Sequence, residues 1–113
     1  MDVILTTTKE LSGVMAEYDN FDKDLVMYIN SVFLVLKQIG VGPSEGFVIT
    51  LKGNETWEDF LPDNKFLRET VKAYMGNKVR LKFDPPTSSA LLEALNRDVA
   101  ECEWRLNAEA ETT

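Results

Sequence analysis

Three aspartates near the start of the chain have a spacing that could bind calcium. Asp19, Asp22 and Asp24 resemble the first ligands of a calcium-binding loop, in which carboxylates at short intervals supply oxygen atoms to one ion. Such a loop also needs a glycine and a closing glutamate at fixed later positions, and the chain has neither there. We therefore interpret Asp22 as a cap for the helix that follows and not as a metal ligand.

Two pairs of acidic residues could, by type alone, act as a general acid and a general base. They are Glu58 with Asp59 and Glu101 with Glu103. Acid–base catalysis requires an environment that separates the two pKa values, and no nucleophile or titratable partner accompanies either pair. The chain also has no histidine, which removes the commonest general base and the commonest metal ligand. The sequence therefore predicts a protein that is not an enzyme and that holds no metal or cofactor.

A glycine-rich segment and a single cysteine are the remaining candidates for a reactive site. The segment GVGPSEG at 40–46 follows a helical pattern and lacks the lysine and hydroxyl of a phosphate-binding loop, so we interpret it as a turn. Cys102 falls on an apolar helical seam, which favours a small core residue over a nucleophile. One thiol cannot form an internal disulfide, so the fold does not depend on an oxidising compartment.

Six of the twelve basic residues lie between positions 65 and 82. Clustered basic residues can bind DNA phosphates or an acidic protein, but an amphipathic helix carries similar residues on its solvated face. The net charge of −7 argues against a general nucleic-acid binder. We favour the solvated face and keep DNA and an acidic neighbouring subunit as alternatives. The members of this basic stripe are Lys65, Arg68, Lys72, Lys78, Arg80 and Lys82.

The hydrophobic pattern predicts an all-α fold, a small bundle of about four helices with one extended loop or short β-segment near 47–52. A length of 113 residues suits one domain, which we place at 1–107, followed by a flexible polar tail at 108–113. The first expected helix runs from Thr6 to Tyr18, with Thr7 and Glu10 as a capping box, and the second from Asp22 to Ile39, ending at Gly40. The third is capped by Asn64 and runs to Phe83, with Phe66 on its apolar side. The fourth runs from about Ser89 to Asn107.

Between the second and third of these helices the chain alternates apolar and polar residues. Phe47, Ile49 and Leu51 are the apolar positions, which predicts a short strand with no partner in the chain. An unpaired strand edge invites pairing with another subunit. Thr56 is positioned to cap a short helical turn that begins at Trp57, a residue that could belong to the core or to an interface. We therefore expect Phe47, Ile49, Leu51 and Trp57 at a subunit interface.

The stretch from Phe83 to Leu106 has the clearest structural signature. Phe83, Asp84, Pro85 and Pro86 form a rigid corner, because proline fixes its own φ and restricts the residue before it. A seam of apolar residues follows at steps of four and three. Its members are Leu91 or Leu92, Leu95, Val99, Cys102 and Leu106, and the opposite face carries Glu93, Arg97, Glu101 and Arg105.

The N-terminal sequence has neither the basic start nor the long apolar run of a signal peptide. The longest apolar run, Val32 to Leu36, is far shorter than a membrane span needs. We therefore expect a soluble protein that has no membrane association and is made in the cytoplasm.

Three stretches resemble one family, the head–tail connector (adaptor) proteins of long-tailed double-stranded DNA phages. They are LKFDPPTSSALLEALNRDVAECEWRLN, FDKDLVMYINSVFLVLKQIGVGPSEGF and ETWEDFL. The most specific parts are Phe83 to Pro86, Glu103 to Asn107 and Gln38 to Gly42, and the resemblance runs from about Phe21 to Asn107. The chain departs from the expected pattern at Gly76 and Asn77, where a bulkier apolar pair is typical, so a kink in the third helix is possible.

This resemblance implies a structural virion protein at the portal vertex. Adaptors form a homo-oligomeric ring, usually a dodecamer, under the portal protein, and their other face receives a stopper or tail-completion protein. DNA passes through the lumen without sequence-specific binding. The C-terminal segment commonly reaches the portal, which points to Trp104, Arg105, Asn107, Ala108, Glu109 and Ala110 as portal-binding residues. The alternative is a small DNA-binding protein that acts in phage DNA packaging through residues Lys65 to Lys82.

Overall fold

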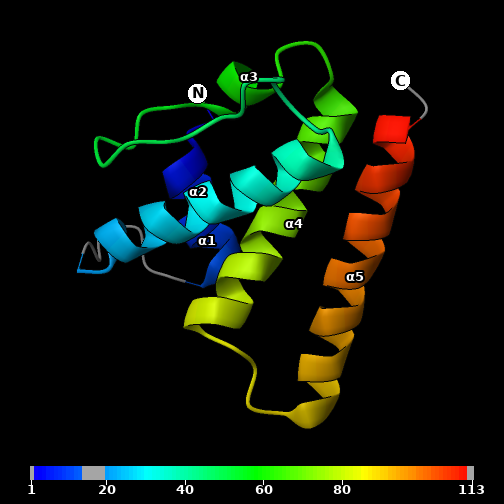
Figure 1. Cartoon of the computed structure of the whole chain (residues 1–113). Coiled ribbons are helices and arrows are strands. Elements are labelled where there is room, and N and C mark those ends of the chain that lie inside the picture. Colours follow the sequence, from blue (N-terminus) through cyan, green and yellow to red (C-terminus); the bar gives the residue numbers. More distant parts are fainter. Residues whose placement is uncertain (1, 14–19, 112–113) are drawn as a thin grey trace.

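Helix α4 (Lys65–Phe83) is the element on which the other long helices pack. The computed structural model describes residues 2–13 and 20–111. In Figure 1, α1 (Ile4–Ser12) and α2 (Asp22–Ile39) cross α4, α5 (Ser89–Glu111) returns alongside it, and the one-turn helix α3 (Trp57–Phe60) lies in the α2–α4 connection. Within the described residues there is no β-sheet, so the predicted all-α fold is confirmed. None of the described helices is long and apolar enough to cross a membrane.

The core is built from the apolar stripes that the sequence predicts. On α4, Val71, Tyr74, Met75 and Val79 have no exposed surface. Helix α2 contributes the six buried residues Leu25, Val26, Ile29, Val32, Phe33 and Leu36. Burying one such side chain is worth roughly 1.5–3 kcal/mol, so these stripes supply much of the driving force for folding.

A cluster of four aromatic rings joins α2 to the segment that follows it. Phe33 packs against Phe60 with ring centroids 4.7 Å apart, and Phe47 lies 5.3 Å from Phe60. Trp57 contacts both Phe33 and Phe60 and is completely buried. Such edge-on and tilted pairs add to the free energy of burial. Trp57 is therefore a core residue of its own subunit and offers no surface to a neighbouring copy.

Of the two alternatives predicted near 47–52, the structure shows the extended loop and not the short strand. The Asn30 side chain accepts a hydrogen bond from the Ile49 backbone N–H (2.8 Å) and donates one to the Ile49 carbonyl (3.0 Å). This amide therefore does for Ile49 what a neighbouring strand would do. The only β-type pairing within the described residues is one antiparallel bridge between Val3 and Thr56.

Most predicted helix ends are confirmed. Thr56 and Asp59 form a capping box at α3, and the Asn64 side chain accepts from the Leu67 N–H at 3.0 Å. Gly40 ends α2 with φ of 102°, the left-handed conformation that glycine adopts without a steric penalty. Asp22 is not a cap. Its carboxylate forms an ion pair with Lys9 at 2.5 Å and so joins α2 to α1.

Helix α1 differs most from its prediction. It begins at Ile4, two residues early, and ends at Ser12, because Gly13 takes a φ of 86° and stops the helix. Thr7 does not cap it. The Thr7 hydroxyl donates to the Asp2 carboxylate at 2.6 Å instead. The expected continuation through Val14, Met15 and Tyr18 lies outside the described residues.

Helix α5 begins as predicted after the Asp84–Pro86 corner but ends later than expected. It continues to Glu111, so residues 108–111 are helical and not part of a flexible tail. The physical reason is that Ala108 to Glu111 are good helix formers and Ala110 packs against the core. Thr112 and Thr113 lie outside the described residues. On the seam, Leu95, Val99 and Leu106 are buried, whereas Leu91 is exposed.

Gly76 sits where Leu11 of α1 packs closely against α4, and α4 is continuous through it. A Cβ atom at this position would lie 2.7 Å from the Leu11 Cβ, which is closer than two carbon atoms can pack. Gly76 therefore permits the close packing of the two helices, which explains why the bulkier residue expected here is absent.

Replacing Gly76 with alanine should lower the free energy of unfolding by about 1–3 kcal/mol, since α1 must move away from α4. Helix propensity alone predicts the opposite sign, a gain of up to ~1 kcal/mol. Urea unfolding of the variant would decide between the two. The matched control is the same substitution in a Leu11→Gly background, where the clashing Cβ is gone and the penalty should disappear. A stabilised G76A single variant would contradict the close-approach explanation.

Candidate partner-binding site

A groove of about 420 Å³ lies between the first turns of α4 and the last turns of α5. Two large aromatic side chains that line it are exposed to solvent, Phe66 at 87% and Trp104 at 71%. Exposed aromatic residues beside a concave surface are typical of sites that bind another protein. The groove is lined by Asn64, Phe66, Leu67, Thr70, Trp104, Arg105, Leu106, Ala108 and Glu109.

The α4 wall of the groove is fixed by local hydrogen bonds. Asn64 caps the helix, and the Arg68 guanidinium donates to the carbonyl oxygens of Leu61 (2.5 Å) and Pro62 (3.1 Å). These bonds hold the preceding turn against the helix, so Phe66 projects from a rigid first turn. Phe66 was expected on the apolar side of α4, and the structure corrects this. The periodic pattern includes Phe66, but none of the helices in the described part of the chain covers its side chain.

The α5 wall is fixed by the buried seam and by one polar contact. The seam residues that pack inward are Leu95, Val99 and Leu106. The Tyr74 hydroxyl of α4 donates a hydrogen bond to the Glu103 carboxylate of α5 at 2.7 Å. Burial, together with this hydrogen bond and the negative charge of Glu103, raises the pKa of Tyr74 well above its usual value. Tyr74 therefore remains a neutral donor that ties α5 to α4 next to Trp104.

The structure brings four of the six predicted portal-binding residues into the groove. Trp104, Arg105, Ala108 and Glu109 line it, while Asn107 and Ala110 do not. Arg105 is held along the helix by an ion pair with Glu101 at 2.5 Å. Sequence reasoning missed Phe66, since only the packing of α5 against α4 shows that it lines the same groove as Trp104.

The four residues predicted at a subunit interface divide into two groups. Ile49 and Trp57 are buried within the subunit, which corrects their assignment to an interface. Phe47 is partly buried in the aromatic cluster, and Leu51 is 60% exposed. Only Phe47 and Leu51 keep surface that another copy could contact, and their role stays a prediction.

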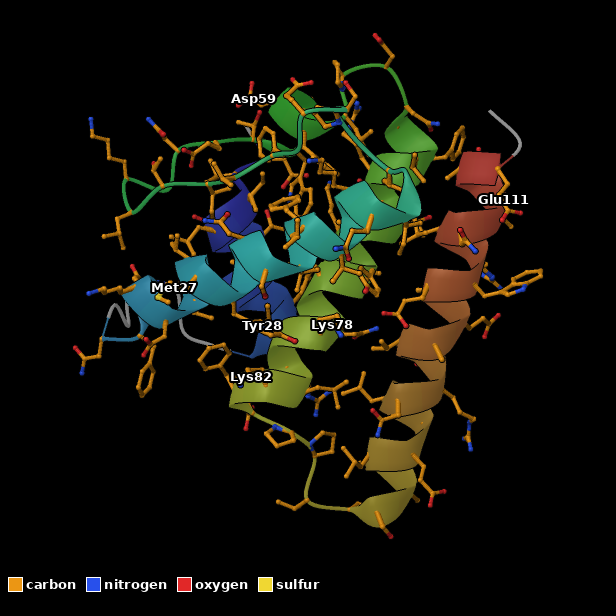
Figure 2. All side chains as sticks on the ribbon, viewed as in Figure 1. Met27, Tyr28, Asp59, Lys78, Lys82 and Glu111 are labelled. Atoms are coloured by element: carbon orange, nitrogen blue, oxygen red, sulfur yellow. The ribbon has the colours of Figure 1, made fainter. Side chains whose placement is uncertain are left out.

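Much of the basic stripe is engaged within the chain. Lys72 pairs with Asp2 and with Glu69, and these hydrogen bonds outweigh burial to raise the pKa of Lys72. Arg68 binds the two backbone carbonyls described above. Figure 2 shows Lys82 beside Tyr28 where α2 crosses the last turns of α4, and its ammonium lies 5.9 Å from the ring centroid. This pattern favours a structural role over a continuous DNA-binding surface.

The acidic residues and the cysteine that the sequence offers for chemistry form no metal site among the described residues, and Asp19 lies outside them. No cluster of three or more potential metal ligands occurs in the described parts of the chain. Cys102 is partly buried beside the core, and burial raises the pKa of its thiol, so it is a poor nucleophile at neutral pH. The feature that the geometry presents is thus an exposed surface that another protein could bind.

Comparison with protein families gives a match to the model described as phage connector protein, over residues 4–113. The chain belongs to the phage connector protein family. Neither the curated proteins nor the solved structures contain a match. Membership makes this connector a structural protein of the bacteriophage particle, at the junction of head and tail, where it contacts other head or tail components. The fold described above and its exposed aromatic groove are therefore those of a phage connector.

The Tyr74–Glu103 bond yields a prediction about the connector's stability. Replacing Tyr74 with phenylalanine should lower the free energy of unfolding by about 1–2 kcal/mol at neutral pH, because Glu103 loses its donor. The difference between the two proteins should shrink in alkali. The raised pKa means that the folded protein retains a proton that the unfolded chain releases above about pH 10, so the stability that Tyr74 contributes is fully present below that pH and is lost as pH rises.

Urea unfolding at several pH values from neutral to about pH 11 measures both effects. Above about pH 10 the wild-type free energy should fall more steeply than that of the Y74F variant, by up to ~1.4 kcal/mol per pH unit. Tyr28, whose pKa is also raised by burial and by Glu103, contributes to the slope in both proteins and serves as an internal reference. Equal slopes in the two proteins would contradict the assignment.

Proposed function

We propose that this connector is the adaptor that joins the portal to the tail, and that the groove between Phe66 and Trp104 is its portal-binding site. Copies of the chain form a ring under the portal, with twelve as the expected number. The opposite face of the ring receives a stopper or tail-completion protein, and DNA passes through the lumen without sequence-specific binding. Family membership supports the connector role, and the exposed aromatic groove is the observation that supports the docking site.

The proposed docking mode follows from the shape of the groove. An apolar or aromatic side chain of the portal would insert between the two rings, since burying aromatic surface contributes most of the binding energy at such sites. Arg105 and Asn64 stand at the groove's lining and can donate hydrogen bonds to the backbone or carboxylates of the inserted segment. The helical C-terminus up to Glu111 is preformed, so little conformational entropy is lost when the portal binds.

Charge also supports passage of DNA without retention. The chain carries 19 acidic and 12 basic residues, and a surface of net negative charge repels the phosphate backbone. The alternative, a DNA-binding packaging protein, relies on the basic stripe, of which Arg68, Lys72 and Lys82 already have partners within the chain. No contact in the described residues favours that alternative.

Replacing Trp104 or Phe66 with alanine should weaken binding to the purified portal protein of the same phage about 30-fold or more. Truncation of an aromatic anchor typically costs ~2 kcal/mol or more, and each 1.4 kcal/mol is tenfold in Kd. Biolayer interferometry on immobilised portal rings measures the affinity. Because both side chains are largely exposed, the free energy of unfolding of the variants should stay within about 0.5 kcal/mol of wild type.

The matched control is Met27→Ala on α2. Met27 is an apolar side chain of similar exposure, 64%, and it does not line the groove. Its truncation should leave portal binding unchanged. If both groove variants bind the portal like wild type, the groove is not the portal site. If Met27→Ala weakens binding as much as they do, apolar exposure in general, and not this groove, drives association.

A further inference from the structure

Two smaller apolar grooves lie at separate places on the subunit, and they have matching properties. The first, the α2 groove, has a volume of about 240 Å³ and lies between α2 and the loop that follows it. The second, the corner groove, has a volume of about 220 Å³ and lies where α4, the proline corner and α5 meet. Figure 1 shows the corner at one end of the molecule and the loop between α2 and α3 at the other.

Each of these grooves carries exposed apolar side chains that the subunit itself leaves uncovered. Leu34 and Val48 line the α2 groove and are 55% and 65% exposed. Leu91 lines the corner groove and is 61% exposed, although the sequence places it on the apolar seam of α5. The segment around Val48 is held rigid by the two hydrogen bonds between Asn30 and Ile49, so this surface is preformed.

Each groove is also lined by one basic and one acidic side chain. Lys37 and Glu45 line the α2 groove, and Arg80 and Asp98 line the corner groove. All four side chains are exposed, and none of them forms an ion pair within the part of the chain that the structure describes. The two grooves therefore match in size, in apolar character and in the charges that border them.

We propose that the α2 groove of one copy docks on the corner groove of the next copy. Leu91 of one copy packs between Leu34 and Val48 of its neighbour. Lys37 then faces Asp98, and Glu45 faces Arg80, so each exposed charge gains a partner of opposite sign. Pairing of the α2 groove with itself could match the charges too, but it would leave Leu91 and the corner groove uncovered. One head-to-tail contact covers both apolar surfaces.

A head-to-tail contact between unlike surfaces repeats from copy to copy, and it closes into a ring when the rotation between copies permits. This inference rests on the proposed function in that it assumes self-association, and it assigns the ring interface to surfaces that are distinct from the Phe66–Trp104 groove. It also gives the Asp84–Pro86 corner a role, since Pro86 lines the corner groove and fixes where α5 begins relative to Arg80.

The test uses two variants of the full chain that each disable one surface, Leu34→Asp and Leu91→Asp. Sedimentation velocity should show that the wild-type chain self-associates and that each variant alone is monomeric. A mixture of equal amounts should give a dimer and no larger species. In that mixture the intact corner groove of the L34D chain meets the intact α2 groove of the L91D chain, and the two disabled surfaces end the assembly.

The matched control is Met27→Asp. Figure 2 shows Met27 on α2, and it lines neither groove although it is 64% exposed, so this variant should associate like wild type. Should an aspartate variant misfold, charge reversal provides the second test. Lys37→Glu and Asp98→Lys should each weaken association at least about tenfold, and the double variant K37E/D98K should recover most of it, because the pair is restored with its signs exchanged.

Several outcomes overturn the proposal. The proposal is overturned if the wild-type chain stays monomeric at every concentration. It is also overturned if the mixture of L34D and L91D remains monomeric. Persistent dimers of L91D alone would show that the α2 groove pairs with itself. If the K37E/D98K double variant does not recover self-association, Lys37 does not pair with Asp98. The proposed alignment of the two grooves is then wrong. Portal binding by the same variants, measured separately, distinguishes failure here from failure of the portal-binding site.

Discussion

The whole arrangement depends on the burial of one apolar stripe along α4. Val71, Tyr74, Met75 and Val79 have no exposed surface, and α1, α2 and α5 are the elements that cover them. A stripe of this width cannot be buried by one neighbouring helix, so α4 must lie at the centre of the described fold. Each covering helix makes a different kind of contact with α4. Helix α1 packs closely at Gly76, and α2 contributes an extensive apolar face. Helix α5 contributes a short apolar seam and one hydrogen bond.

The third of these contacts leaves α5 with the exposed surface that the proposed portal docking requires. Of its 23 residues only Leu95, Val99 and Leu106 are buried, so most of the helix surface faces outward. Such an arrangement is weak unless a polar contact fixes the rotation of the helix, and Tyr74 supplies that contact to Glu103, the residue next to Trp104. The interaction that orients α5 is thus adjacent in sequence to Trp104, the exposed side chain of the proposed portal-binding groove.

The sequence predicts the helices well and the irregular segments poorly, for identifiable reasons. The stripes of α2 and α4 and the caps at Thr56 and Asn64 are local signals, and the structure confirms them. The loop at 47–52 has the alternation of a strand, but its hydrogen bonds go to Asn30, a residue 19 positions away from Ile49 that no local pattern connects to it. The helical end of α5 was missed because polar composition suggested a flexible tail, whereas Ala110 reaches the core beside Gly40.

The candidate site shows the same limit of local information. Trp104 and Arg105 stand out in the sequence, but Phe66 belongs to the apolar pattern of α4, and periodicity alone places it inside the protein. Its position is decided by how the other helices pack on α4: they cover the Val71–Val79 stripe, whereas α5 leaves a groove beside the first turn, which Phe66 lines. A large aromatic residue that is left uncovered costs solubility, so an isolated subunit gains nothing from it. Under the proposed portal docking, an uncovered aromatic residue at the first turn of the central helix has a physical purpose, because the portal would cover the surface that the subunit leaves exposed.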